Sequence, residues 1–568
     1  MTLSVSNSQE TSFAADHWGY RIEDGSGTND YKPIPKLSTP EVVYSKETPE
    51  NTELNLNFAI KATSGLTPGS YKKDVLLTFA TSHASTTATF LPGAEFANIA
   101  KTLVGSGTAS RFERSDTPPA IYGQLNPTPS DLAKYPKVST VDSGTPIFLW
   151  LDGDKLLWWA DTDLVYTNED CETMFREVAG YTHDENKGLF ADLRGIDTSH
   201  TKNMKSMFAS TWEKAIGYSK IIGLDLSEFN TSNAENMESM FESMLATSGI
   251  DLSKFDTRKV TTMKAMFKGS NINGLNIDAF NTSNVTDMSE MFNALNEPDQ
   301  PELTLSLANF NTSKVTNMSN MFASQKIVGL DIHTFDTSKV VNMSMMFHRV
   351  GVNTLDLSNF DTKNVRNMSS MFSYMSGLKR LEISNFNTGN VEDMSRMFTH
   401  SSSLKNLGIL NFNTSKVKDM SEMFLGSSIE KLDLSSFDTS EVLKMNYMFD
   451  SMSRLEELNI SNFNTQKTTE MIAMFRDLLV IKTLDVSSFD TRNVIRMHQM
   501  FYNCKLLSKI EASDTFKVDS LYDSGYEMFR WSTKLVGGNG TVYDPLKIDK
   551  EYARIDKNGT PGYFTQKP

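Results

Sequence analysis

The chain has 568 residues, of which 39% are hydrophobic, so it is long enough to form several structural units with sizeable cores. Its formal net charge of −15 at pH 7 disfavours nucleic acids and anionic lipid surfaces as partners, because both carry the same sign of charge. The sequence holds no apolar run of about 18 residues, and its first residues, MTLSVSNSQE, are polar. We therefore expect neither a transmembrane helix nor a secretion signal within the chain.

Residues 1–88 do not repeat, and they predict a β-sandwich-like N-terminal domain. Two stretches of alternating apolar and polar residues flank a Thr-Pro-Gly-Ser segment at 67–70, as is typical of two strands around a turn. In residues 89–170, the five prolines from Pro118 to Pro136 indicate an extended linker, and IFLWLDGDKLLWW predicts a hairpin around Asp152-Gly153. We expect this tryptophan-rich hairpin to cover the open edge of the first repeat.

The dominant feature of the sequence is a repeat that ends in Met-Phe. This pair occurs fourteen times between Phe175 and Phe529, and most successive pairs are 25 or 26 residues apart. Three steps are longer, with 33, 33 and 30 residues, and all three lie before or end at Phe322. A typical unit reads LDLSNFDTKNVRNMSSMF, from Leu355 to Phe372.

Each part of the unit predicts a local structure. Leu355 and Leu357 alternate with polar residues, as in a strand with one buried face. The triplet Phe-Asp/Asn-Thr occurs eleven times, and its polar side chains can accept backbone hydrogen bonds where the strand ends and a helical turn begins. Four apolar residues then stand at i, i+3, i+6 and i+7, a spacing that places them on one face of a helix: Val365, Met368, Met371 and Phe372.

One unit is too small to bury its own apolar face, so neighbouring units must stack and share a core. The predicted fold class is α/β: a leucine-rich-repeat-like solenoid over residues 171–530, with about 14 repeats of one short parallel strand plus one short helix. Residues 531–568 predict a C-terminal cap, because glycine turns and aromatic residues replace the repeat there. Of the 31 methionines, 26 occupy two positions of the repeat, and we interpret them as core packing rather than as a metal or redox site.

Reactive chemistry has little support in the sequence. The two cysteines, Cys171 and Cys504, lie at opposite ends of the repeat region and are expected to be free thiols. The eight histidines are scattered, and no metalloprotease, serine-hydrolase or P-loop motif occurs. We expect no catalytic activity, no cofactor and no metal site.

One candidate binding feature is the outward strand position between the two buried aliphatic residues. In eleven units this position holds seven acidic residues: Asp225, Asp251, Asp331, Asp356, Glu382, Asp433 and Asp485. Stacked like charges repel, so either neighbouring polar groups satisfy them as a structural ladder or they form an anionic stripe for a basic or polyhydroxylated partner. We favour the structural ladder and keep the stripe as the functional alternative.

The longer units supply a second candidate. They place STWEKAIGYSK, with Trp212 and Tyr218, and NALNEPDQPELT outside the regular turn. Aromatic residues on such loops are plausible binding anchors, because loops can vary while a solenoid stays fixed. Irregular packing near the N-terminal end explains the insertions equally well.

The unit L-x-L-x-x-F-[DN]-T-x-x-V-x-x-M-x-x-M-F closely resembles the repeat of BspA-like leucine-rich-repeat surface proteins. The resemblance covers about residues 171–530, and the flanking hairpin and the ending LVGGNGTVYD through PGYFT also resemble that family's terminal segments. Members of the family are exported proteins linked to adhesion to host cells, matrix proteins or other microbes. The resemblance therefore implies a non-catalytic adhesin at the bacterial cell surface.

On this interpretation the partner is a surface protein or glycan of a host or microbe. Contact with a membrane would occur only through an anchor absent from this chain, and the protein would be monomeric. Two other functions remain open. The solenoid could be a stalk that projects the N-terminal domain, or that domain could hide an enzyme site.

Overall fold

The computed structural model describes residues 2–6, 18–23, 32–33, 41–45, 55–60 and 76–80 and most of 86–567. Within 86–567 the described residues exclude 125–127, 185–186, 214–216, 245–249, 273, 295–301 and 523–524. The chain divides into two compact units, Met1–Thr87 and Ala88–Pro568. Each unit is described separately below.

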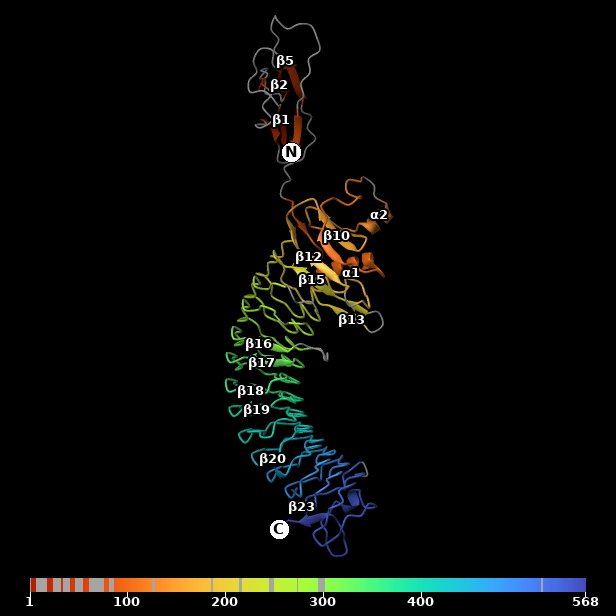
Figure 1. Cartoon of the computed structure of the whole chain (residues 1–568), viewed down its shortest axis with the longest axis vertical. Coiled ribbons are helices and arrows are strands. Elements are labelled where there is room, and N and C mark those ends of the chain that lie inside the picture. Colours follow the sequence, from red (N-terminus) through yellow and green to blue (C-terminus); the bar gives the residue numbers. More distant parts are fainter. Residues whose placement is uncertain are drawn as a thin grey trace. The chain divides into compact units, whose positions relative to one another are not determined.

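The described strands of the first unit form two three-stranded antiparallel sheets (Figure 1). One has the strand order β4-β1-β6, from Glu41–Ser45, Thr2–Ser6 and Leu76–Ala80. The other has the order β3-β2-β5, from Lys32–Pro33, Trp18–Glu23 and Asn55–Ile60. Both strands expected around the Thr-Pro-Gly-Ser segment exist, as β5 and β6, but they belong to different sheets. The segment at 67–70 lies outside the described residues.

The second unit begins with a module that extends the strand ladder of the repeats. Its helices are α1 (Gly93–Val104) and α2 (Pro129–Lys134), and its strands are β7 (Ala88–Thr89), β8 (Arg111–Arg114), β9 (Ile147–Asp152), β10 (Lys155–Ala160) and β11 (Val165–Tyr166). One sheet has the order β15-β12-β8-β10-β9, where β12 is Leu189–Asp192 and β15 is Ile221–Asp225. All pairs in it are parallel except β9 with β10. The antiparallel hairpin therefore ends the ladder.

This arrangement changes two expectations about residues 89–170. The proposed linker contains α1 and β8, and the hairpin does not pair with a repeat directly, because β8 lies between β10 and β12. Trp158 is fully buried in the main core, whereas Trp150 and Trp159 lie in a second cluster with Phe148. Alternating strand residues point to opposite faces of the sheet, which explains the division.

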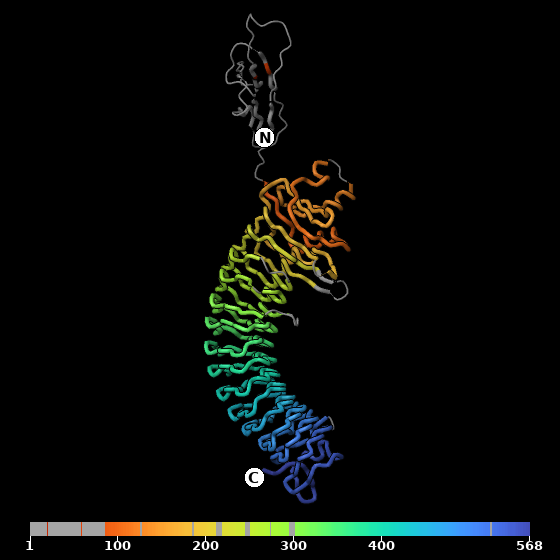
Figure 2. Tube along the Cα trace, viewed as in Figure 1, coloured from red at the N-terminus to blue at the C-terminus, as the bar shows by residue number. Residues whose placement is uncertain are grey.

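The repeats form stacked parallel layers, as Figure 2 shows for the successive coils that follow the module. Short parallel strands pair between neighbouring layers: β16 (Leu303–Ser306) with β17 (Ile327–Asp331), β18 (Thr354–Asp356) with β19 (Arg380–Glu382), β20 (Lys431–Asp433) with β21 (Glu457–Asn459), and β22 (Thr483–Asp485) with β23 (Lys509–Ala512). A second series of single parallel bridges runs unbroken from Asp170↔Asn203 to Glu470↔Arg496. The expected solenoid-like stacking is confirmed.

The expected helix of each repeat is wrong: between residues 171 and 530, the described residues form short strands and turns and contain no helix. The Met371 N–H donates to the Met368 carbonyl at 3.2 Å, a bond of one tight turn, and the Phe372 N–H donates to Met397 in the next layer at 3.0 Å. Ser370, which lies between Met368 and Met371, has a backbone φ of 56°, and this left-handed conformation interrupts a right-handed helix. The spacing i, i+3, i+6 and i+7 places side chains inward in these turns as it would in a helix.

The core consists of columns of identical side chains. Val365, Met368, Met371 and Phe372 are fully buried, as are their equivalents in neighbouring layers. The rings of Phe347 and Phe372 are stacked, with centroids 5.9 Å apart and planes 2° apart. All 26 methionines of the two repeat positions are buried, which confirms their interpretation as core packing.

The C-terminal residues close the last layer. A 3-10 turn, Lys550–Tyr552, precedes β24 (Phe564–Gln566), which pairs in parallel with β23. The ring of Phe564 meets that of Phe516 edge-on, with centroids 4.9 Å apart, and Tyr563 is fully buried. In the part of the chain that the structure describes, no helix has both the length and the apolar content that a membrane span needs.

Replacing Ser370 by glycine is expected to raise the free energy of unfolding by about 1 kcal/mol, because the Cβ atom is strained at φ 56°. Thermal unfolding followed by circular dichroism measures the effect. Ser369 is the matched control, since it is the adjacent serine and its side chain donates to Asn367 at 2.7 Å. Ser369→Gly should lower stability. An equal loss in both variants would contradict the strain argument.

Candidate functional site

The acidic strand row is held by hydrogen bonds within its own layers. Asp356 accepts the backbone N–H of Ser358 at 3.0 Å, which lowers the pKa of its carboxyl. The same bond to the residue two positions on occurs at Asp225, Asp251, Asp433 and Asp485, at 2.9 or 3.0 Å. Each side chain thus caps the turn that follows its strand. The geometry favours the structural ladder over a stripe free for ligands.

The other two members of the row are also engaged. The Glu382 carboxylate accepts the Ser384 hydroxyl at 2.6 Å. A hydrogen bond from the His333 side chain, followed by a weaker one from its N–H, lowers the pKa of Asp331. Lysine or arginine side chains also lie beside two carboxylates of the row: Arg194 is 3.4 Å from Asp225, and Lys567 pairs with Asp485. The row is therefore partly neutralised.

The described residues of the first insertion include two short paired strands. Strands β13 (Thr211–Glu213) and β14 (Gly217–Ser219) are antiparallel, and Trp212 is opposite Tyr218 in register. The side chains of both residues lie outside the described part of the chain. Residues 295–301 of the second insertion lie outside it as well.

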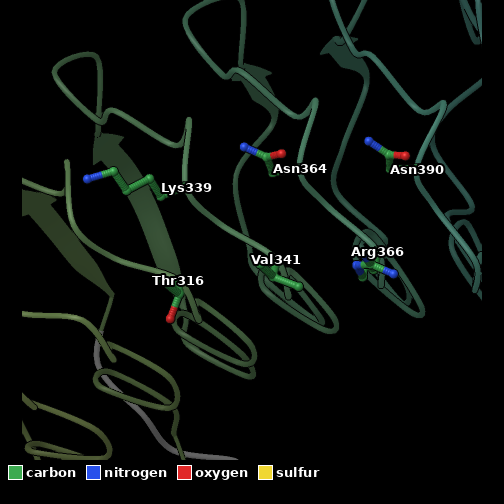
Figure 3. A pocket seen from close by; sticks show the side chains of 6 residues that line it. All are labelled: Thr316, Lys339, Val341, Asn364, Arg366 and Asn390. Carbon is green, nitrogen blue, oxygen red and sulfur yellow. The ribbon is translucent and has the colours of Figure 1, made fainter.

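A groove lies on another face of the layers, and the sequence reasoning missed it. Figure 3 shows its six lining side chains in two rows, and the hollow measures about 410 Å³. One row holds the residues directly before the buried valines, and the other holds those directly after them. The first row is Lys339, Asn364 and Asn390, and the second is Thr316, Val341 and Arg366. Because every layer repeats these two positions, the rows continue beyond the hollow.

Amide groups order the first row. Asn284 donates from Nδ2 to the Arg258 carbonyl at 2.7 Å, and its Oδ1 accepts the Lys314 ammonium at 2.6 Å. Asn390 makes the same pair of bonds, to the Lys363 carbonyl at 2.8 Å and from Lys416 at 2.6 Å. Each amide is thus fixed with its oxygen toward the lysine of the next layer. The sequence signal for this row was the frequent alternation of Asn and Lys before the repeat valine.

A second exposed cluster lies two residues after the Met-Phe pair. The Arg349 guanidinium is 5.1 Å from the centre of the Tyr374 ring, and the centres of the Tyr374 and His400 rings are 4.9 Å apart. His348 meets Tyr374 edge-on, and burial, followed by the charge of Arg349, lowers the pKa of His348 to about 4. Cation–aromatic contacts of this kind occur within folds and at binding surfaces alike.

The cysteines do not supply a reactive centre. Both are free and buried, as the sequence predicted for free thiols, and burial raises the pKa of each to about 12. At neutral pH they are therefore protonated and poor nucleophiles. Among the described residues, no group of three His, Cys, Asp or Glu side chains is placed to hold a metal ion.

Stacked layers, shared columns of Phe and Met, and rows of equivalent surface positions define a tandem-repeat protein with a solenoid-like fold. The chain belongs to the family described as "Mycoplasma protein of unknown function, DUF285". The family model matches residues 169–304, 300–406, 351–428, 374–477 and 427–536, which together make up more than half of the chain. No curated protein and no solved structure matches the chain.

Proposed function

We propose that this protein is a non-catalytic adhesin of the BspA-like leucine-rich-repeat type, with about fourteen repeat units. It acts outside the cell, at a bacterial surface, and attaches the cell to a protein or glycan of a host or another microbe. It acts as a monomer.

The observation that carries the proposal is the groove, in which side chains at equivalent positions of successive layers face solvent on a fixed backbone. The layers from Thr316 to Asn390 place their lining residues in two ordered rows. Such a surface binds a partner without ordering its own backbone, so little conformational entropy is lost on binding. The resemblance of the repeat to adhesion proteins points to the same role.

The alternative is a stalk in which the repeats only project the first unit. The two functions differ in which unit makes the contact, and the boundary between Thr87 and Ala88 allows a clean test. Attachment to cultured epithelial cells and to matrix-protein and glycan arrays would be measured for the full chain and for residues 88–568. Circular dichroism and thermal melting would verify that the shorter chain is folded.

We expect residues 88–568 to keep the attachment of the full chain. Loss of attachment by a folded 88–568 chain would favour the stalk. Absence of attachment by the full chain on every surface would overturn the adhesin proposal.

A further inference from the structure

The groove is locally positive in a chain that is negative overall. From Lys314 to Lys418 its two rows contain five cations and one carboxylate, Glu392, whereas the whole chain has a net charge of −15. Glu392 accepts hydrogen bonds from Arg366 and Lys418, at 2.9 Å each. One carboxylate is thus shared by two cations, and the rows keep an excess of positive charge.

Two lysines of the first row are held in place by neutral partners. Lys314 and Lys416 donate to the amide oxygens of Asn284 and Asn390, which are neutral. Elsewhere on the layers, cations pair with carboxylates, as Arg396 does with Glu422 through two bonds of 2.7 and 2.9 Å. An ammonium group positioned by an amide keeps its full charge for an anionic ligand.

The hollow lies where the alternation of Asn and Lys is interrupted. Lys339 follows Lys314 rather than an asparagine, and Asn364 is followed by Asn390 rather than a lysine. The Asn364 amide donates to the Ser338 carbonyl at 2.7 Å, so its oxygen is oriented along the row, where no lysine occupies the next layer. The nearby Asp336 carboxylate accepts the N–H of Ser338. The hydrogen bonds of Ser338, followed by the charge of Lys339, lower the pKa of Asp336.

The lining decides between classes of anionic ligand. The six residues of the hollow include two cations, two amides, a threonine and a valine, and none of them is aromatic. Single-stranded nucleic acids are held largely by stacking of bases on aromatic rings, for which this lining offers no platform. Amides and a threonine hydroxyl instead match the hydroxyl groups of a sugar, and cations match its carboxylate or sulfate groups.

We propose that the groove between these two rows binds an anionic polysaccharide, with the chain of sugars running along the stacked layers. The inference rests on the proposed adhesin function and names its ligand class. Each layer presents the same two positions, so a linear polymer that runs along the layers contacts side chains of several layers at once. Lys314, Lys339 and Arg366 bind the anionic groups, and Asn364 binds a hydroxyl.

The test measures binding of the full chain to immobilised heparin and hyaluronate, with uncharged dextran and an oligothymidine strand as comparison ligands. The groove variant is Lys314→Gln/Lys339→Gln/Arg366→Gln. The matched control is Lys379→Gln/Arg380→Gln/Arg454→Gln, which removes the same charge from exposed positions that do not line the hollow. Thermal melting would check that both are folded, and single Lys339→Gln replaces the triple variant if that one is not.

We expect salt-dependent binding of at least one anionic polysaccharide, and affinity about tenfold lower in the groove variant than in the control, with a smaller salt slope. Equal losses in the two variants, or no binding by the unaltered chain, would overturn the inference. If the oligothymidine bound more strongly than the polysaccharides, the ligand of the groove would be a nucleic acid and the inference would be wrong. If the groove variant still attaches to cells, the adhesin function stands and this ligand assignment fails.

Discussion

Replacing Arg476 by methionine is expected to lower the local free energy of unfolding by about 3–5 kcal/mol, because it leaves a buried carboxylate without its partner. The Asp450 side chain is 1% exposed and receives two bonds from Arg476, from Nε at 3.0 Å and from Nη2 at 2.5 Å. Burial raises the pKa of Asp450, and the hydrogen bonds and charge of Arg476 oppose that rise. Hydrogen exchange of the amides in residues 445–477 measures the loss.

The loss should depend on pH in a definite direction. Without Arg476, the pKa of the folded Asp450 rises further above its unfolded value, which is about 3.9. Stability associated with a raised pKa is present below the unfolded pKa and is lost as pH rises through the folded pKa. The deficit of Arg476→Met should therefore be larger at pH 7 than at pH 4.

An exposed pair provides the control for this prediction. Arg258 pairs with Asp256 at 2.6 Å, and the side chain of Arg258 is 73% exposed. Arg258→Met should lower stability much less than Arg476→Met, since solvent screens the pair. Comparable losses in the two variants would show that burial of Asp450 is not what makes its pair important.

Replacing Thr362 by valine is expected to cost about 2–4 kcal/mol, because two backbone groups lose their partner while the side-chain volume is unchanged. The Thr362 hydroxyl donates to the Asn387 carbonyl at 2.9 Å and accepts the Asn387 N–H at 2.8 Å. Thr362 is 1% exposed, so water does not replace these bonds readily. Thr388 makes the same two bonds to Asn413, which explains the threonine of the Phe-Asp/Asn-Thr triplet.

Thr286→Val is the matched control for this second prediction. Thr286 also donates to a neighbouring layer, in this case the preceding one, where the Thr261 carbonyl accepts at 3.1 Å, but Thr286 is exposed. Its loss should stay below about 1 kcal/mol, because water can satisfy the released carbonyl. Chemical denaturation and hydrogen exchange of residues 360–390 measure the difference. If Thr362→Val proved as stable as Thr286→Val, the buried threonine bonds between layers would not be a source of stability.

The acidic strand row shows how far the residues alone could predict a site. The sequence identified its seven members, because Asp356 and its equivalents recur between two buried aliphatic residues. The carboxylates either bind ligands or cap turns. Which of the two they do depends on whether the backbone N–H two residues later in the chain points toward the carboxylate. Only the backbone geometry places the Ser358 N–H within 3.0 Å of Asp356.

The groove shows the opposite case. Its residues are visible in the sequence as the positions on either side of the repeat valine, yet nothing in a linear pattern says that Lys339, Val341 and Arg366 share one surface. That follows from the turns, which replace the expected helix. The residue with positive φ differs from layer to layer and can be Ser, Thr, Ala, Met, Asn, Gln, Glu, Arg or Tyr, so no side-chain type predicts it.

The amino-acid sequence by itself determined the stacking, the repeat length and the core, because a period of 25 or 26 residues repeats the same apolar side chains. Burial of those side chains depends on spacing alone, and both a helix and a turn satisfy the spacing. The tertiary structure decided between the two, because in each layer backbone N–H groups such as that of Phe372 find carbonyls in the next layer. A hydrogen bond between layers joins residues of two different units. The sequence of one unit therefore does not predict it, and only the stacked structure shows it.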